Sequence, residues 1–224
     1  MTPPRIDGSV FHQVNLHTDF AHHICAVHKK LYDLGFSVGN DGNSSIKIDN
    51  DHMWITPAGL EKAKLLPQHI SKISISSGKL VEGDFPPSTE WKLHAEIYKH
   101  NPKVGAIVHS HPPYSIACSL AGISLDEPVL PELVLSLGSV ETCEYICPGT
   151  QTIALQAAKA LGKGRKAIIL ERHGVVAVGQ SIQEALIDLE RVEHAARILL
   201  LARSAGNIAP LSQTQLKELQ QSIL

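Results

Sequence analysis

The sequence predicts an α/β fold, namely a three-layer α/β/α single domain with a mostly antiparallel central sheet. Short segments that alternate apolar and polar residues form neighbouring hairpins, and helical segments stand before, between and after them. No repeat or low-complexity linker divides the 224 residues, of which 43% are hydrophobic, and this is enough for one large core. We therefore expect one domain over 1–224, with a core at about 18–205 and a C-terminal helix at 212–223.

The first half of the chain alternates between helical and strand patterns. Apolar residues recur with helical spacing over 18–34, and Gly35 is placed to end that helix. In the following segment, SIKI and MWI alternate as strands, and DND between them predicts a hairpin turn. ISKISIS predicts a third strand. Ser88 or Thr89 can cap the next helix, which we expect over 89–99.

The second half repeats these patterns. PKVGAIVHSH alternates as a strand that ends at Pro112, and a helix over about 150–161 ends at Gly162. KAIILE and GVVAVG predict two strands on either side of the short turn RHG. Two capping boxes predict the starts of the last two helices, at Ser181 with Glu184 and at Ser212 with Gln215.

Charge and apolar runs limit the classes of function. A formal net charge of -2 leaves no basic excess for phosphates along a nucleic acid, so we expect no nucleic-acid partner. The N-terminal segment lacks the charged-then-apolar order of a signal peptide, and apolar runs such as ILLLA fall far short of the roughly 20 residues of a membrane span. We expect a cytoplasmic protein that does not bind membranes.

Histidines at the ends of two predicted strands suggest a metal site. Residues two apart in a strand point the same way, so His109 and His111 in AIVHSH can share one ion. Catalytic zinc sites commonly use three protein ligands and leave one position open. His173 is the best third candidate, because it follows the strand AIILE and Gly174 behind it allows a close backbone approach. His94 competes, but its place on a helical stripe favours packing.

Two further groups have both a structural and a functional interpretation. Glu90 in the first turn of a helix complements the helix dipole, or it is a carboxylate that moves a proton beside the metal. The residues of GNDGNSS, TPAG and PST offer backbone N–H and hydroxyl donors, which form ordinary turns and caps or an anion site at a helix N-terminus. No nucleotide-binding glycine motif is present.

Several motifs in order carry a resemblance to a known family: GNDGNSSIKI, ITPAG, STEWKLHAEIY, AIVHSHPPYSIA, LPELVLSLG, PGT and ERHGVVAVG. From about residue 20 to 205 the chain resembles the class II aldolase/adducin family, whose enzymes include L-fuculose-1-phosphate aldolase and L-ribulose-5-phosphate 4-epimerase. The resemblance implies one Zn²⁺ per subunit, with Mn²⁺ or Co²⁺ as alternatives. It also implies a small-molecule substrate, a sugar phosphate, and a homotetramer with active sites between subunits.

The resemblance also assigns roles to residues. The zinc ligands of the family fall on His109, His111 and His173, and its catalytic acid/base falls on Glu90. A glutamate at this position is similar to the aldolases, whereas the epimerases have aspartate. The phosphate-binding positions of the family fall on Gly42, Asn43, Ala58, Gly59, Ser88 and Thr89.

The chain departs from the family pattern at three places. Ala58 stands where the sugar-phosphate enzymes have Ser or Thr, so one hydroxyl donor to the phosphate is missing. The aldolase tyrosines, one in the segment that reads VLPEL here and one near the C-terminus, have no counterpart as proton donors, because VLPEL contains no tyrosine and none follows Tyr145. Glu132 falls close to a catalytic glutamate of the related methylthioribulose-1-phosphate dehydratases, and its alternative interpretation is a surface glutamate that begins a strand.

These residues lead to an expected reaction. We expect a zinc-dependent aldolase that cleaves a C–C bond in a small ketose phosphate through an enediolate stabilised by the metal. The same intermediate serves an epimerase, a dehydratase or a decarboxylase of a sugar acid phosphate, which are the alternatives. A non-catalytic adducin-like interaction module is a further alternative, although such modules lack the metal histidines that this chain has.

Overall fold

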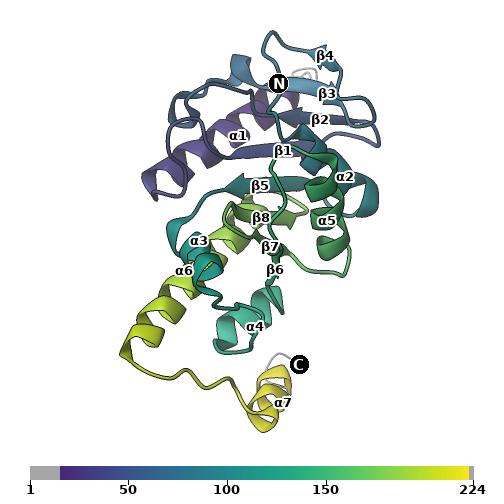
Figure 1. Cartoon of the computed structure of the whole chain (residues 1–224). Coiled ribbons are helices and arrows are strands. Elements are labelled where there is room, and N and C mark those ends of the chain that lie inside the picture. The colour runs from purple at the N-terminus through teal and green to yellow at the C-terminus, as the bar shows by residue number, and fades with distance from the viewer. Residues whose placement is uncertain (1–15, 222–224) are drawn as a thin grey trace, which may run out of the picture.

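A single eight-stranded sheet forms the centre of the molecule in the computed structural model, which describes residues 16–221 (Figure 1). The strand order is β4-β3-β2-β1-β5-β8-β7-β6. Neighbouring strands are antiparallel except β6 and β7, which are parallel. The strands are β1 (Asn43–Lys47), β2 (His52–Ile55), β3 (Ser71–Ser74), β4 (Leu80–Glu82), β5 (Ala106–Ser110), β6 (Glu141–Cys143), β7 (Ala167–Leu170) and β8 (Gly174–Gly179). The mostly antiparallel sheet confirms the predicted fold class.

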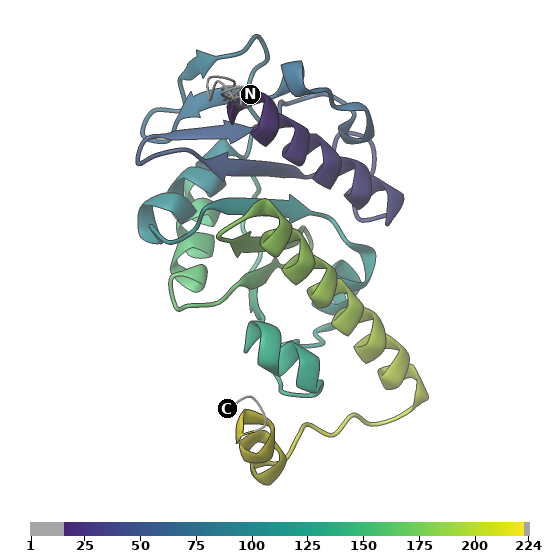
Figure 2. The ribbon, with the colours of Figure 1, turned by 180° about the vertical axis from the view of Figure 1, so that it is seen from behind.

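Helices cover both faces of this sheet. Figure 2 shows α1 and α6 across one face, and α2 and α5 lie against the other (Figure 1). The α-helices are α1 (Leu16–Asp33), α2 (Trp91–His100), α3 (Pro113–Ala121), α4 (Pro131–Leu137), α5 (Gln151–Leu161), α6 (Ile182–Ala205) and α7 (Gln213–Gln221), and two 3-10 turns are η1 (Lys62–Lys64) and η2 (Pro67–His69). Within residues 16–221, no helix is both long and apolar enough to cross a membrane.

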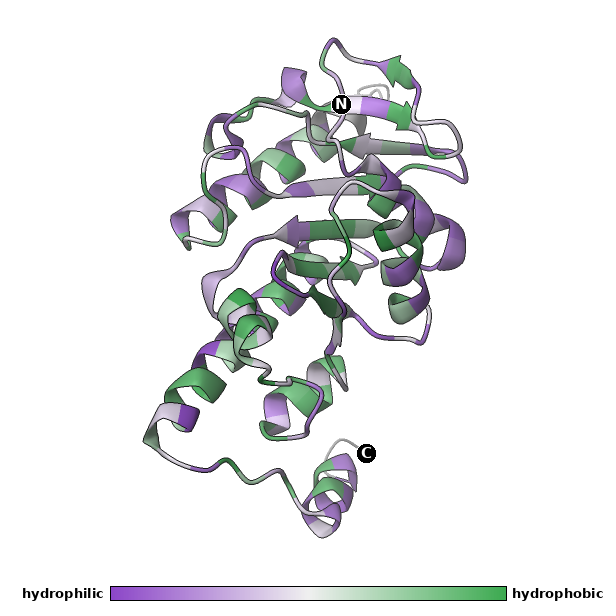
Figure 3. Ribbon diagram, in the orientation of Figure 1, coloured by the Kyte–Doolittle hydropathy of each residue, from purple (hydrophilic) through white to green (hydrophobic). Residues whose placement is uncertain are grey.

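The central strands are buried because their side chains alternate between two hydrophobic clusters. In β5, Ile107 packs with α2 and α5, whereas Val108 faces α1 and α6. In β8, Val176 and Val175 divide between the same two clusters. Figure 3 shows these strands mostly in hydrophobic colours. The sheet therefore separates two cores, and the end of β5 lies between them.

Local signals set several boundaries as predicted. Ser181 accepts a hydrogen bond from the Glu184 amide (3.2 Å) at the start of α6. Ser212 and Gln215 cap each other ahead of α7, with the Gln215 amide 3.3 Å from Ser212 Oγ and the Ser212 amide 2.8 Å from Gln215 Oε1. Residues 222–223 of that predicted helix lie outside the described part of the chain.

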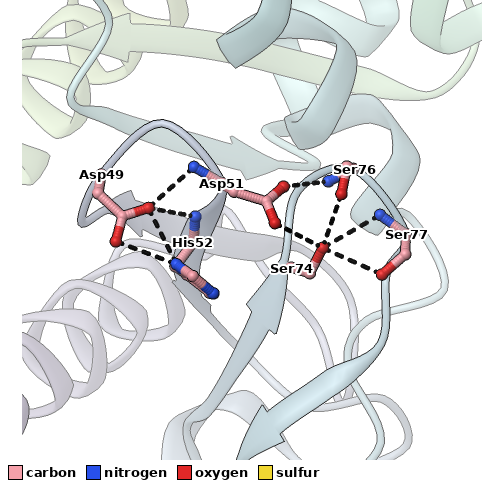
Figure 4. A network of polar contacts seen from close by, with 6 residues as sticks. All are labelled: Asp49, Asp51, His52, Ser74, Ser76 and Ser77. Carbon is pink, nitrogen blue, oxygen red and sulfur yellow. Dashed lines mark hydrogen bonds and ion pairs between the residues drawn. The ribbon is translucent and has the colours of Figure 1, made fainter.

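The predicted hairpin turn between β1 and β2 is present, and its acidic residues hold it closed (Figure 4). Asp49 Oδ1 accepts hydrogen bonds from the amides of Asp51 and His52, each at 2.8 Å. The Asp51 carboxylate in turn accepts from the Ser76 amide (2.8 Å) and from Ser74 Oγ (3.1 Å). These bonds tie the turn to the end of β3, at the opposite end of β1 from Asn43.

The structure contains two helices that the sequence patterns did not predict. The segment after Pro112 forms α3, and the segment around Glu132 forms α4. The interpretation of Glu132 as the start of a strand is therefore wrong. Pro131 occupies the first turn of α4, where its missing N–H costs nothing, and Leu133 and Leu137 face the core one turn apart.

The start of α3 depends on a distant carboxylate. Glu193 of α6, only 3% exposed, accepts hydrogen bonds from the amides of Tyr114 and Ser115, each at 2.8 Å, and from Ser115 Oγ at 2.7 Å. These bonds satisfy donors that a helix N-terminus leaves open. They also anchor the chain immediately after His111.

We expect Glu193→Ala to lower the free energy of unfolding by about 2–3 kcal/mol, because the amides of Tyr114 and of the buried Ser115 lose a charged acceptor. Urea unfolding followed by circular dichroism measures the change. Glu193→Gln keeps one acceptor oxygen and serves as the matched control, with a smaller expected loss. An unfolding midpoint of Glu193→Ala equal to that of the original chain would contradict this explanation of α3.

Candidate metal centre and active site

Three imidazoles converge where β5 ends and β8 begins. His109 Nε2 lies 3.2 Å from His111 Nε2 and 3.4 Å from His173 Nε2. One ligand atom from each of the three residues lies within 4.8 Å of the others, and among the described residues they form a group that could hold a metal ion. The antiparallel pairing of β5 with β8 brings the two strand ends together. The structure therefore places the three predicted ligands as one cluster.

Hydrogen bonds on the outer side of the cluster orient two of the rings. His109 Nδ1 lies 2.8 Å from the Val175 carbonyl oxygen, so this nitrogen carries the proton and the lone pair remains on Nε2. His111 Nδ1 lies 3.4 Å from Asp41 Oδ2, which has the same effect on that ring. When the two rings are neutral, both Nε2 atoms thus present a lone pair to the centre.

The pKa values of two of these histidines favour the form that binds metal. Burial, together with the neighbouring charge of His109, lowers the pKa of His111 and of His173 to about 4. Burial also acts to lower the pKa of His109, but the Glu90 carboxylate outweighs it and the pKa is raised. Since a metal ligand must be neutral imidazole, His111 and His173 are ready to bind at neutral pH.

The Glu90 carboxylate faces the three histidines. Its Oε2 lies 3.3 Å from His109 Nε2 and its Oε1 lies 3.6 Å from His173 Nε2. Burial acts to raise the pKa of Glu90, but the attraction of His109 and His173 and a hydrogen bond from Asn43 outweigh it and hold this pKa well below its usual range. Glu90 is therefore an ionised base at neutral pH, beside the candidate metal site.

The position of Glu90 differs slightly from the predicted one. Helix α2 begins at Trp91, and Glu90 itself is the N-cap residue, with no side-chain capping bond. Neither Ser88 nor Thr89 is the N-cap that we expected. Instead, Ser88 Oγ accepts a hydrogen bond from the Glu90 amide (3.3 Å) and closes a turn before the helix. The Glu90 side chain is thereby released from capping and turns toward the histidines.

A chain of buried polar groups supports Glu90 from behind. Asn43 Nδ2 donates to Glu90 Oε2 at 2.8 Å, and Asn43 Oδ1 lies 2.6 Å from His94 Nε2. His94 Nδ1 lies 2.6 Å from Ser45 Oγ, which is 2.8 Å from the Tyr98 hydroxyl. Because the Asn43 amide nitrogen donates to Glu90, its oxygen must accept from His94 Nε2–H. His94 is thus a neutral donor to Asn43, consistent with a pKa that burial lowers to about 3.

We expect His94→Leu to reduce turnover by about 10–100-fold while bound metal per subunit stays unchanged, because Asn43 then loses the bond that aims its amide at Glu90. Steady-state kinetics and elemental analysis of the metal measure the two quantities. Tyr98→Phe removes a hydroxyl at the far end of the same chain and is the control, with nearly normal turnover. Full activity in His94→Leu would show that Asn43 needs no support.

A pocket of about 360 Å³ adjoins Glu90 and His111. Gly42 has a φ of +79°, and a Cβ there would lie 2.8 Å from the His109 carbonyl oxygen, so only glycine fits between the loop and β5. All six residues predicted to bind phosphate line this pocket: Gly42, Asn43, Ala58, Gly59, Ser88 and Thr89. The structure therefore brings these six residues together beside the three histidines.

Glu132 and the larger cavity of the molecule both lie away from the pocket beside Glu90. Glu132 is exposed in the first turn of α4 and does not line this pocket. A larger cavity of about 910 Å³ lies between the end of α2, β8 and the start of α6, and none of the predicted site residues lines it. We place the candidate site at the smaller pocket, because the converging histidines and the ionised carboxylate are there.

Three residues of the site were missed or underestimated from the sequence. Asp41 orients His111, Lys62 lines the pocket, and His94 supports Asn43 as well as packing. Asp41 lies in a loop and Lys62 in the 3-10 turn η1, and neither follows a periodic pattern, so only the folded backbone reveals their neighbours. His94 could have been found from its spacing, since it stands one helical turn after Glu90.

Fold and site together define a class of protein. The chain belongs to the class II aldolase family, because the model of the Class II Aldolase and Adducin N-terminal domain matches residues 22–200. This confirms the family resemblance seen in the sequence.

This chain is similar to individual proteins of the family that have different activities. The 3-oxo-tetronate 4-phosphate decarboxylase of Haemophilus influenzae is 32% identical over 86% of this chain and 91% of its own. The L-fuculose phosphate aldolase of Escherichia coli is 33% identical over 80% of this chain and 81% of its own. The crystal structure of YgbL from Escherichia coli superposes with a TM-score of 0.81 at 28% identity, covering 91% of this chain and 99% of that one.

Proposed function

We propose that this protein is a metal-dependent lyase that breaks a C–C bond beside the carbonyl group of a small sugar phosphate. The observation that carries the proposal is the Glu90 carboxylate, which stands between three converging imidazoles and a pocket lined with hydrogen-bond donors. Three histidine nitrogens suit Zn²⁺, with Mn²⁺ or Co²⁺ as alternatives. A bound divalent ion would supply Lewis-acid charge that stabilises an enediolate.

The residues of the chain then have distinct tasks. His109, His111 and His173 would hold the ion, and Glu90 would move a proton to or from the reacting carbon. Asn43 holds Oε2 of Glu90, and Oε1, which lies 3.6 Å from His173 Nε2, would be the oxygen that faces the substrate. The pocket beside Glu90 would hold the phosphate through the six residues assigned to it, and this position fixes which carbon comes next to the carboxylate.

Two reactions fit this arrangement, and one observation favours decarboxylation. Aldol cleavage and decarboxylation of a 3-oxo acid both leave an enediolate that needs a proton on carbon. Aldol chemistry also needs a group that exchanges a proton with the aldehyde oxygen, and no tyrosine follows Tyr145 to supply it. Release of CO₂ requires no such group. We therefore favour decarboxylation of a 3-oxo sugar acid phosphate, with the aldolase reaction expected from the sequence as the second candidate.

The two candidates are separated by one assay. The zinc-loaded protein is incubated with 3-oxo-tetronate 4-phosphate and, separately, with L-fuculose 1-phosphate, and CO₂ and aldehyde are measured. CO₂ from the first compound supports decarboxylation, and aldehyde from the second supports aldol cleavage. Proton NMR of both mixtures detects epimerised or dehydrated products, which would move the protein to another branch. No reaction over a wider panel of sugar phosphates would contradict the lyase proposal.

Assembly and location extend the proposal. The homotetramer with active sites between subunits follows from the family resemblance, and light scattering in solution tests it. In such an assembly, the exposed Glu132 of α4 would be the second acid/base that the aldolase alternative needs, at the site of a neighbouring copy. Glu132→Gln should then lower turnover without changing bound metal, and unchanged turnover would remove it from that role. A cytoplasmic location stays a prediction.

A further inference from the structure

Lys62 is a buried cation in the wall of the pocket beside Glu90. It lines this pocket together with Ala58 and Gly59, although only 2% of the residue is exposed. Its ammonium donates to the carbonyl oxygens of Pro57 (3.1 Å) and Leu60 (3.2 Å). An ammonium has three N–H donors, so one remains beyond these two bonds.

No carboxylate in the described part of the chain lies within ion-pair distance of the Lys62 ammonium. Burial lowers the pKa of Lys62 to about 8, and the attraction of Asp41 only partly opposes this. Asp41 lies nearer to His111, at 3.4 Å, and His28 behind Lys62 is neutral because burial lowers its pKa to about 3. Lys62 is thus largely charged at neutral pH, and an unpaired buried charge is costly.

The loop around Ala58 explains why a bound anion would need the charge of the Lys62 ammonium. Ala58 has no hydroxyl, and its amide already donates to the Pro86 carbonyl oxygen at 3.0 Å. Position 58 therefore contributes no free donor to the pocket. The other donors of the wall, such as Ser88 and Thr89, are neutral, and Lys62 is the one Lys or Arg among the residues described along it.

We propose that Lys62 is an anion-binding residue of this pocket, whose ammonium contacts the substrate phosphate and replaces the hydrogen bond that Ala58 does not give. That the anion is the substrate's phosphate rests on the proposed function. The general claim, that this pocket binds a phosphate group through Lys62, does not depend on which bond the protein breaks. Neither the sequence patterns nor the family resemblance assigns Lys62 to the site.

The test measures the affinity of the zinc-loaded protein for inorganic phosphate by isothermal titration calorimetry, without any turnover. Lys62→Gln keeps an N–H donor for the carbonyls of Pro57 and Leu60 but removes the charge. We expect it to fold and to bind phosphate about tenfold or more weakly, as the loss of a charged hydrogen bond implies. Adding Ala58→Ser to Lys62→Gln should recover part of the affinity, because it restores the missing hydroxyl.

The outcomes separate this inference from the proposed function. Phosphate affinity equal to that of the original chain in Lys62→Gln would overturn the inference, since Lys62 would then only hold the loop. Lys62→Arg keeps the charge, and we expect it to bind phosphate better than Lys62→Gln; the reverse order would also overturn the inference. Lyase activity with a normal phosphate affinity in Lys62→Gln would leave the proposed function intact. Weakened phosphate binding in a protein without lyase activity would support Lys62 and contradict the lyase.

Discussion

Glu90→Gln should lose about 10²–10⁴-fold in turnover and keep its full complement of metal. Glutamine matches the size of the glutamate and still offers an oxygen to the Asn43 amide, which donates to Glu90 Oε2 at 2.8 Å. It cannot accept and return a proton. The three imidazoles are unchanged, so the metal stays bound. The measurements are the rate constant for turnover and the metal content per subunit by elemental analysis.

The matched control for this prediction is on the same helix. Glu96 of α2 pairs with Lys99 at 2.9 Å and does not line the pocket, so Glu96→Gln should turn over substrate at a nearly normal rate. Loss of metal in Glu90→Gln would mean that the carboxylate is itself a ligand. Retained turnover with full metal would remove Glu90 from the reaction.

Gly174→Ala should disrupt the metal centre and the sheet together. A Cβ at position 174 would lie 2.8 Å from His111 Cδ2 and 3.1 Å from His109 Cε1, and it would overlap the Ser110 carbonyl oxygen. This oxygen is backbone in a paired central strand, so β5 and β8 would have to move apart. Overpacking of this kind costs about 1–3 kcal/mol, and we expect the variant to lose most of its bound zinc.

Zinc stoichiometry and a urea unfolding curve measure these two effects on Gly174→Ala. Gly206→Ala is the control, because a Cβ there meets no atom within 4 Å, and we expect normal zinc content and stability. The prediction would fail if Gly174→Ala bound zinc at the original stoichiometry and unfolded at the original urea concentration.

Most of the fold could be predicted from local patterns in the sequence. The β1–β2 hairpin and the helices α1, α5 and α6 follow from alternation, helical spacing and capping residues that act within a few positions. Helices α3 and α4 were missed because their first turns contain prolines and their stability comes from elsewhere. The carboxylate of Glu193 that holds the start of α3 is 78 residues away from Ser115 in the chain.

The candidate site also contains residues that the sequence could predict and residues that it could not. His109, His111 and His173 could be proposed because each stands at a strand end, and sheet pairing brings strand ends together. Asp41 and Lys62 could not be proposed, because their contacts depend on how the loop of Asp41 and the 3-10 turn η1 of Lys62 pack in the folded chain. The helix boundary at Glu90 was misplaced by up to two residues, since both Ser88 and Thr89 are good caps and the competing turn is not visible in the sequence.

The place of β5 and β8 in the strand order determines which part of the sheet unfolds last. These two strands are neighbours in the interior of the sheet, with four strands on one side of the pair and two on the other. Fraying begins at the edges, at β4 and β6, where few bonds hold the chain. We expect the slowest hydrogen exchange at the amides of Val108 and Val176. The imidazole cluster would therefore survive partial unfolding that already exposes both sheet edges.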